Sequence, residues 1–472
     1  MASSLGRNST NTATPTKATF AYWLKGADDG TAQGIWGWHR GNDASNYWLG
    51  VYFSTNGSMY FNWKQGGNYA TIRGTTQKFR DNQAWGQHVI TIDTTLATAE
   101  DRVKWFYNGE RITSFEDSSY TVAENATITN WSNSSDKLEI GTFYQSSTAK
   151  DLSTNSSITG FHCCDGYAYE ASSFGSVNST TGIWVGNPSP SVNYGSQGEY
   201  IKFEDSSNLG LDSSGNTNNM SVSGSLTQNL DNPSNNFCTL NGQTKFRVNT
   251  VSTYDLMKYG NNELAPTSNS QIVYTQGTIG VTSGKWYWEA QPYSGVGFGV
   301  GICYANMQTN TNAQFWDNST LMGAAVTLTG AGNLGFNGKS GETYNTSFSF
   351  TQATQTLCFA LDMDNNALYV GIDGVWQNSG NPTSGASRTG SFLAYLASDQ
   401  AYTNSGQPVF PFVGDVETGN IAKTRINFGQ GVFGLTPLTG TTYTDGNSEG
   451  KFKYTVPTGY YTLNTKNLKV FG

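Results

Sequence analysis

The sequence predicts an all-β protein built from two jelly-roll-like antiparallel β-sandwiches joined by a long Ser/Asn/Gly-rich connection. Short apolar stretches alternate with polar residues in period two, as they do in strands that bury one face. Turn residues separate these stretches at intervals of about ten residues, which is typical of β-sandwiches. The 472 residues include 55 glycines, and 14% are aromatic whereas only 13% are charged. This composition favours strands and turns over helices.

The elements of the first sandwich follow one another closely. Its strands are expected at 19–25, 34–40, 47–53, 58–64, 85–93, 102–112, 138–143 and 161–170. Asn108-Gly109 divides the sixth of these stretches and is a strong signal for a two-residue hairpin turn.

Residues 284–304 carry the clearest strand pattern of the chain. The first run places Trp286 and Trp288 on one face. The second run, 295–302, has glycine at every other position, which costs backbone entropy unless another backbone or a large ring approaches closely. The two runs are predicted to form a hairpin through 292–294 at the centre of an antiparallel sheet.

The domain boundaries follow changes in composition. Residues 1–17 are small and polar, and they are expected to form an N-terminal arm that is ordered only if it docks. The first sandwich is placed at 18–205, and the second, with a C-terminal tail, at 246–472. Between them, 206–245 lacks apolar periodicity and reads as a linker.

Charge and cysteine usage narrow the classes of partner. The formal net charge is −8 and no cluster of Lys or Arg stands out, so no nucleic-acid partner is expected. No apolar run is long enough to predict membrane insertion. The N-terminus has no apolar stretch of the signal-peptide kind, and five cysteines form a sparse, odd set. We interpret these two features as signs of synthesis in a reducing cytoplasm, and we expect the thiols to be buried.

No catalytic residue is predicted. The carboxylates considered for glycoside hydrolysis do not form a convincing acid–base pair, and are expected to be structural: Glu110, Glu139, Asp165, Glu170, Asp415 and Glu417. The three histidines, His39, His88 and His162, lie outside any nucleophile motif. Cys163 and Cys164 are neighbours on a strand and point to opposite faces, so no metal site is expected there.

Aromatic residues are the candidate ligand-binding groups. Thirteen tryptophans and twenty-six tyrosines are more than two cores require, and flat rings can stack on sugars. The candidates are Trp36, Trp38, Trp63, Tyr69, Trp131 and Trp316, with core packing as the alternative for each. No cofactor is predicted. Calcium remains an alternative at the Asp/Asn-rich stretches 28–29, 42–43 and 212–219, although such residues also favour turns.

Three motifs in the second half of the chain resemble a SPRY domain. They are GKWYWE from Gly284, GVGFGVG from Gly295, and LDMDNNALYVGIDGVWQNSGNP from Leu361, and the similarity extends over most of 270–435. The resemblance implies a β-sandwich module for recognition, a family without a catalytic role as a class.

The first half, over roughly 18–205, resembles a laminin-G-like, concanavalin-type jelly roll. The segments that carry the likeness are FAYWLKG, WGQHVITID, VKWFYNGE, EIGTF and DGYAYEASSFG. Further segments, at 173–175, 200–210, 212–216, 231–240 and 454–468, resemble virion structural proteins of tailed marine-type bacteriophages in the same order.

The combined resemblance implies a non-enzymatic phage virion surface protein, in a tail fibre or related appendage, that recognises the host surface by binding glycan. Its expected partners are other virion proteins, further copies of itself, with trimers commonest among fibres, and a host glycan or receptor. Its expected location is the virion surface. A capsid or tail decoration protein is the alternative, because no heptads or fibre shaft are present. A polysaccharide hydrolase is the third reading.

Overall fold

A computed structural model describes most of the chain. The described residues are 3–10, 13–26, 31–41, 45–81, 83–143, 152–243, 246–248, 257–267, 272–304, 323–328, 334–337, 343–392, 408–416 and 419–472. They divide into two compact units, the first extending to Gln228 and the second beginning at Asn229. No helix in the described part of the chain is both long enough and apolar enough to cross a membrane.

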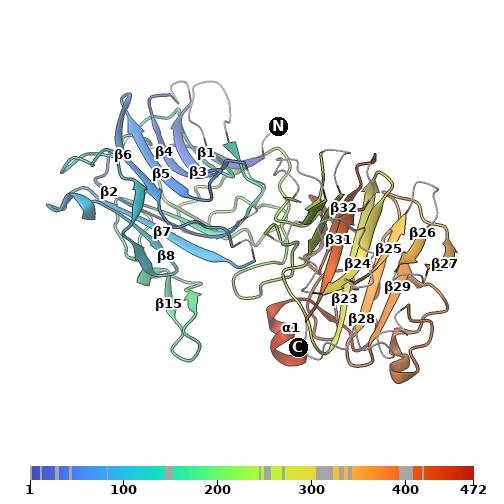
Figure 1. The fold of residues 1–472 in the computed structure, drawn as a ribbon. Helices are drawn as coiled ribbons and strands as arrows, with labels where there is room; N and C mark the ends of the chain where they lie inside the picture. The colour runs from blue at the N-terminus through green and yellow to red at the C-terminus, as the bar shows by residue number, and fades with distance from the viewer. Residues whose placement is uncertain are drawn as a thin grey trace. The chain divides into compact units, whose positions relative to one another are not determined.

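The first unit is an antiparallel sandwich of two large sheets, as predicted (Figure 1). Among the described residues, one sheet has the order β10 (Phe115–Asp117), β6 (Asn68–Thr75), β5 (Met59–Gln65), β4 (Trp48–Phe53), β3 (Gln33–Arg40), β11 (Asp136–Ile140), β1 (Ser4–Asn8), β18 (Ser221–Ser223). The other has the order β17 (Glu199–Ile201), β14 (Ser157–Asp165), β2 (Lys17–Lys25), β7 (Gly86–Asp93), β8 (Val103–Tyr107), β9 (Glu110–Ile112). Two small ribbons pair β12 (Thr142–Phe143) with β13 (Leu152–Ser153), and β15 (Gly175–Val177) with β16 (Trp184–Gly186). Short 3-10 turns lie at Ala99–Asp101 and Ala171–Ser173.

The predicted hairpin at Asn108-Gly109 is confirmed. It joins β8 to β9, and both turn residues have positive φ, 48° at Asn108 and 84° at Gly109. Both angles lie in the left-handed region that a two-residue hairpin turn demands.

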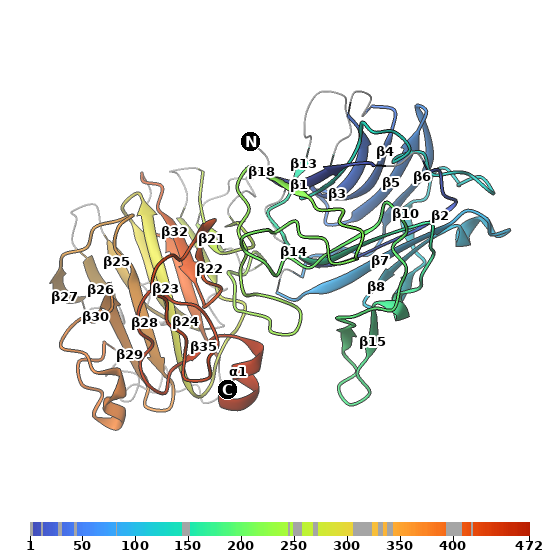
Figure 2. The same ribbon diagram turned by 180° about the vertical axis from the view of Figure 1, so that it is seen from behind.

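The N-terminal arm docks, and it contributes a strand. β1 lies between β11 and β18, with Leu5 opposite Ile140 on one side and Val222 on the other. Figure 2 shows β1 beside β18. The partners of this strand come from sequence positions far from it. The described residues among 1–17 are therefore part of the first sandwich rather than an appendage to it.

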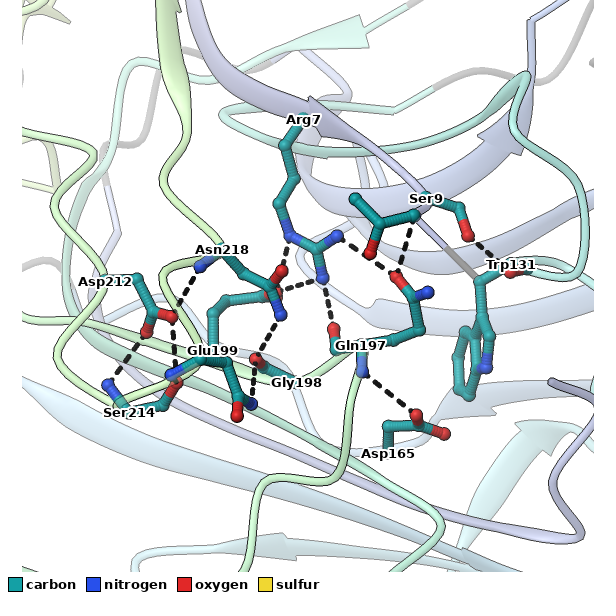
Figure 3. A network of polar contacts seen from close by, with 12 residues as sticks. Arg7, Ser9, Trp131, Asp165, Gln197, Gly198, Glu199, Asp212, Ser214 and Asn218 are labelled. Atoms are coloured by element: carbon teal, nitrogen blue, oxygen red, sulfur yellow. Dashed lines mark hydrogen bonds and ion pairs between the residues drawn. The ribbon is translucent and has the colours of Figure 1, made fainter. Parts of the chain in front are cut away.

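Arg7 joins β1 to the start of β17 and the residues just before it (Figure 3). Its Nε donates to Glu199 Oε2 at 2.8 Å, and one terminal nitrogen donates to the side-chain oxygen of Gln197 at 3.3 Å. The other terminal nitrogen donates to Glu199 and to the backbone carbonyl of Gln197. The same segment accepts a 2.8 Å hydrogen bond at the Gly198 carbonyl from the side chain of Asn218. Residues far apart in sequence are thus held in one buried polar network.

The second unit is also a sandwich of two antiparallel sheets (Figure 1). Among the described residues, one sheet has the order β19 (Phe246–Val248), β22 (Ile272–Gln276), β31 (Val409–Asp415), β24 (Phe298–Tyr304), β25 (Gly323–Leu328), β26 (Leu334–Asn337), β27 (Thr343–Phe348). The other has the order β20 (Met257–Lys258), β21 (Glu263–Leu264), β32 (Lys423–Asn427), β23 (Lys285–Ser294), β28 (Leu357–Asp362), β29 (Ala367–Ile372), β30 (Val375–Trp376), and β35 (Tyr461–Thr462) adds to it in parallel beside β23. The remaining elements are the ribbon of β33 (Val432–Phe433) with β34 (Thr436–Pro437), a 3-10 turn at Pro382–Ser387, and the C-terminal helix α1 (Thr465–Phe471).

The predicted hairpin between the two runs of 284–304 is wrong, although both runs are strands. β23 pairs with β28 and β32, whereas β24 pairs with β25 and β31 in the opposite sheet. Gly295 and Gly297, with φ of 71° and 87°, turn the chain from one sheet to the other. The close approach expected at the glycine face is present at Gly299, where a Cβ atom would lie 2.9 Å from the side chain of Val416.

The predicted linker, 206–245, is divided between the two units. Residues up to 228 belong to the first unit, where β18 completes the sheet beside β1, and those from 229 belong to the second. Phe237 is buried in the second unit and bridges to Asn464, just before α1. The polar composition hid these contacts because isolated buried side chains such as Phe237, together with hydrogen bonds, hold the segment in place without apolar periodicity.

Candidate functional site

Four of the six aromatic residues predicted to bind ligand are core residues instead. Trp36, Trp38, Trp63 and Trp131 each have 0% of their surface exposed. Trp38 lies 5.5 Å from Trp131 between ring centroids, and the indole nitrogen of Trp63 donates to Asn130 at 2.8 Å. Trp36 and Trp38 are two positions apart on β3, so both point into the sandwich. The prediction of ligand binding is therefore wrong for these four residues, which pack in the core as the alternative stated.

Trp316 lies outside the described residues. Tyr69 is the remaining candidate, and it is half-buried on β6. Its ring stacks on that of Tyr120, with the centroids 5.3 Å apart and the planes inclined by 24°. Tyr120 is 55% exposed, so this pair presents an aromatic surface to solvent.

A row of side chains on neighbouring strands surrounds this pair. Trp48 on β4 is opposite Lys64 on β5, which is opposite Tyr69 on β6. The Lys64 ammonium lies 5.2 Å from the centre of the Tyr69 ring, and Trp48 meets the same ring edge-on at 5.4 Å. Because the neighbouring Leu49 and Trp63 belong to the core, the row occupies the outer face of the eight-stranded sheet. We call Trp48, Lys64, Tyr69 and Tyr120 the Tyr69 platform.

The backbone holds Tyr120 in an unusual conformation. Its φ of 64° lies in the left-handed region, which costs a residue other than glycine about 1–2 kcal/mol. The preceding residue, Ser119, accepts a hydrogen bond at its carbonyl from the Ile72 amide at 2.9 Å, and its own amide donates to Asp117. The strained residue therefore carries an exposed ring over the sheet, as residues of binding sites commonly do.

A second aromatic surface covers the outer face of the six-stranded sheet, and no sequence signal other than the alternation in YAYE pointed to it. His162 and Tyr200 stack at 3.9 Å, and His162 Nδ1 lies 2.9 Å from the Tyr194 hydroxyl. Tyr167 and Tyr169 stack at 6.1 Å, and Tyr167 is 38% exposed. This surface is more enclosed than the Tyr69 platform, because the segment carrying it packs on the sheet beneath.

The histidines have structural surroundings. Burial lowers the pKa of His88 and of His162 to about 3, so both are neutral at physiological pH. His88 Nδ1 accepts a hydrogen bond from the Trp105 indole at 3.2 Å. His39 Nε2 contacts Glu139 at 3.0 Å. Each ring is held by a neighbour in the core or sheet, as expected for structural histidines.

The carboxylates considered for catalysis are dispersed. Glu139 is buried, with Lys137 at 2.9 Å and Ser4 at 3.1 Å, whereas Glu170 pairs with Lys104 at the surface. Asp165 accepts from the Gln197 amide, and Glu110 is exposed on β9. Asp415 is buried on β31, and Glu417 lies outside the described residues. Within the described ranges, no group of three or more His, Cys, Asp or Glu side chains is arranged to hold a metal ion.

The stretch 212–219 that resembled a calcium loop is a hydrogen-bonded turn. Asp212 Oδ1 accepts from the amides of Tyr200 and Ser214, and Oδ2 accepts from the Ser214 hydroxyl and the Asn218 amide. These four hydrogen bonds, each 2.8–2.9 Å long, occupy both carboxylate oxygens of Asp212, as is common for Asp side chains in turns. The stretches 28–29 and 42–43 lie outside the described residues.

No protein-family model matches this chain, and no curated protein matches it. Among solved structures, the SPRY domain of human HERC1 is 21% identical over 35% of this chain and 87% of that domain, with a TM-score of 0.25. Domains LG4-5 of the mouse laminin α1 chain are 9% identical over 87% of this chain and 79% of theirs, with a TM-score of 0.27. A SAP-like pentraxin from Limulus polyphemus is 12% identical over 47% of this chain and 88% of its own, with a TM-score of 0.30. These similarities are weak, and the assignment of the fold rests instead on the sheets of the chain itself. Their strand orders identify it as a protein of two antiparallel jelly-roll-like β-sandwiches.

Proposed function

We propose that this chain is a non-catalytic surface protein of a bacteriophage particle, part of a tail fibre or related appendage, that binds carbohydrate on the host surface through the Tyr69 platform. The observation that supports carbohydrate binding is the stacked pair of Tyr69 and Tyr120 on an outer sheet face. The phage assignment rests on the sequence resemblance alone. In this proposal the chain is made in the bacterial cytoplasm and assembles with other virion proteins.

The chemistry of the platform favours a sugar over a purely apolar ligand. An exposed aromatic face offers apolar contact area to the C–H side of a pyranose ring, and polar groups beside it fix the orientation. Lys64 places a positive charge next to that face, so an acidic polysaccharide fits best. The alternative of a decoration protein would use these surfaces for assembly contacts alone.

Replacing Tyr120 with alanine should weaken binding of the purified chain to host surface polysaccharide roughly fivefold to tenfold, the loss expected for one stacked ring. Tyr120→Phe should retain most of the affinity, because the ring face is unchanged. The measurement is isothermal titration with extracted polysaccharide, supported by labelling of host cells and competition with phage adsorption.

Two matched variants show where binding occurs. Tyr443→Ala removes a ring of the second unit that is 38% exposed, and it should leave affinity unchanged. Tyr167→Ala tests the second aromatic surface, where the exposed fraction is the same. Loss of binding in Tyr167→Ala but not in Tyr120→Ala would contradict the assignment to the Tyr69 platform. Presence in purified particles without saturable binding to cells or glycan would favour the decoration role, and release of sugar products would favour a hydrolase.

A further inference from the structure

The ribbon of β15 and β16 projects from the first unit and is anchored firmly at its base (Figure 1). The Trp184 indole nitrogen donates to Gln87 Oε1 at 2.7 Å, and Gln87 Nε2 donates to the Phe174 carbonyl at 3.1 Å. The Trp184 ring also lies directly against Gly109 and Gly175, where a Cβ atom would come within 2.3 Å and 2.6 Å of it. The base of the ribbon therefore has little freedom to move on the sheet.

The tip of the ribbon is closed by its own hydrogen bonds. The side-chain oxygen of Asn178 accepts from the amides of Thr180 and Thr181, both at 3.0 Å. The Asn178 amide donates to the Ile183 carbonyl at 2.8 Å, continuing the ladder beyond β15 and β16. The ribbon is thus preorganised, and a partner would not have to order it.

The outer part of this ribbon exposes aliphatic side chains. Val177 is 59% exposed, Ile183 is 64% exposed and Val185 is 48% exposed. No residue from Gly175 to Gly186 is charged, although the whole chain carries a net charge of −8. Exposed strands that remain unpaired usually carry a charge or a proline that prevents pairing with another chain, and this ribbon has neither.

Both edges of the ribbon have free backbone groups. The Asn178 amide donates to the Ile183 carbonyl, and the Asn187 amide donates to the Phe174 carbonyl. Hydrogen-bonded and non-hydrogen-bonded residue pairs alternate along an antiparallel ribbon. Ser176 and Val185, the pair midway between these two bonds, therefore direct their backbone N–H and C=O groups toward each other. Val177 on one edge and Trp184 on the other consequently direct their backbone N–H and C=O groups away from the ribbon. Within the described residues, neither edge pairs with another strand.

We propose that this ribbon is a self-association element that pairs edge to edge with the same ribbon of a second copy of the chain. Two identical strands pair antiparallel about a two-fold axis, so each copy uses the same residues on both sides of the contact. The uncharged ribbon allows this approach between molecules of equal negative charge, whereas a basic or acidic partner would find no complementary group there. Pairing through the β16 edge would cover Ile183 and Val185 and would satisfy the outward N–H and C=O groups of Trp184.

The first test is the oligomeric state of the full chain, measured by sedimentation velocity over a range of concentrations. The unmodified chain should show a concentration-dependent dimer. Ile183→Lys and Val185→Lys should each weaken dimerisation about tenfold to a hundredfold, because a buried aliphatic contact is lost and like charges then face one another. Val375→Lys is the matched control, since Val375 is 67% exposed in the second unit, and it should leave the dimer unchanged.

A second test reports the contact directly. The five native cysteines are all buried, and none of them forms a disulfide. A single cysteine introduced on the paired strand as Val185→Cys should therefore form a disulfide-linked dimer on mild oxidation, whereas Ser176→Cys, on the other strand of the ribbon, and Val375→Cys should not. A chain that is monomeric at its highest soluble concentration would overturn the proposal. So would an oligomer that the Ile183→Lys and Val185→Lys variants form as strongly as the unmodified chain does.

Discussion

Replacing Arg7 with alanine should lower the free energy of unfolding of the first unit by about 3–5 kcal/mol, the cost of leaving a buried ionic partner uncompensated. Glu199 is completely buried and faces Arg7, which also binds the side chain and carbonyl of Gln197. Burial raises the pKa of Glu199 to about 7 even with the Arg7 charge opposing the shift. Without Arg7, Glu199 would have to be buried as an unpaired anion or take up a proton.

Urea denaturation followed by tryptophan fluorescence measures this loss, because the buried tryptophans of the first core report its unfolding. Lys17→Ala is the control: Lys17 is 2.9 Å from Asp93, but its side chain is 39% exposed, so its removal should cost less than about 1 kcal/mol. Adding Glu199→Gln to Arg7→Ala should recover part of the stability, since the unpaired charge is then gone. An Arg7→Ala variant as stable as Lys17→Ala would show that the network does not hold β1.

The second unit should become less stable as the pH rises from about 4.5 to 7, and Glu289→Gln should remove that dependence. Glu289 is completely buried on β23, and burial raises its pKa to about 7. Between the ordinary carboxyl pKa and this value, the folded unit keeps a proton that the unfolded chain has released. Raising the pH therefore favours unfolding, by at most about 3 kcal/mol over this interval.

Glu289 also fastens the C-terminal segment to the sheet. One oxygen accepts from the Tyr454 amide at 2.8 Å and from the Tyr287 hydroxyl at 3.1 Å, and the other accepts from the Lys453 amide at 3.0 Å and from Asn427 at 3.3 Å. A glutamine presents one oxygen and one donor to these four donors. The variant should therefore lose about 1–3 kcal/mol at pH 7 as well, the usual cost of unsatisfied buried groups.

The quantity to compare is the difference in unfolding free energy between Glu289→Gln and the unmodified chain at each pH. The difference is needed because His88 and His162, in the first unit, act in the opposite direction. Burial lowers their pKa to about 3, so the stability that they contribute falls as the pH drops below their ordinary value of about 6.5. Glu204→Gln, at a side chain 77% exposed, is the control. Parallel pH profiles for Glu289→Gln and the unmodified chain would refute the assignment.

Period-two alternation predicted the strands well and their sheet partners poorly. The runs that became β23 and β24 have the expected alternation, but nothing in that pattern distinguishes a hairpin from a crossing between sheets. Similarly, the strand that carries Trp36 and Trp38 was predicted correctly, and only the tertiary structure decides that both rings face the interior. An exposed ring and a buried ring have the same sequence signature within a strand.

Polar interactions between distant segments were harder to predict from the sequence than the strands were. The segment SLGRN has only one large apolar residue, yet it pairs on both sides within the sheet because Arg7 and its backbone find partners across the unit. Tyr120 follows no periodic pattern, and its left-handed conformation results from contacts of the neighbouring backbone with β6. Local sequence carries no record of such partners, so the exposed half of the Tyr69 platform could not be predicted.

The position of β1 has a consequence for the order of folding during synthesis. This strand leaves the ribosome before its two neighbours, β11, ending at Ile140, and β18, at Ser221–Ser223. At about 5–20 residues per second, the strand waits many seconds before its sheet can close. Such contacts between distant segments make folding slow, because the chain entropy is lost before the contacts form. β1 is therefore exposed to wrong pairing with a neighbouring nascent chain for longer than β11 or β18 is.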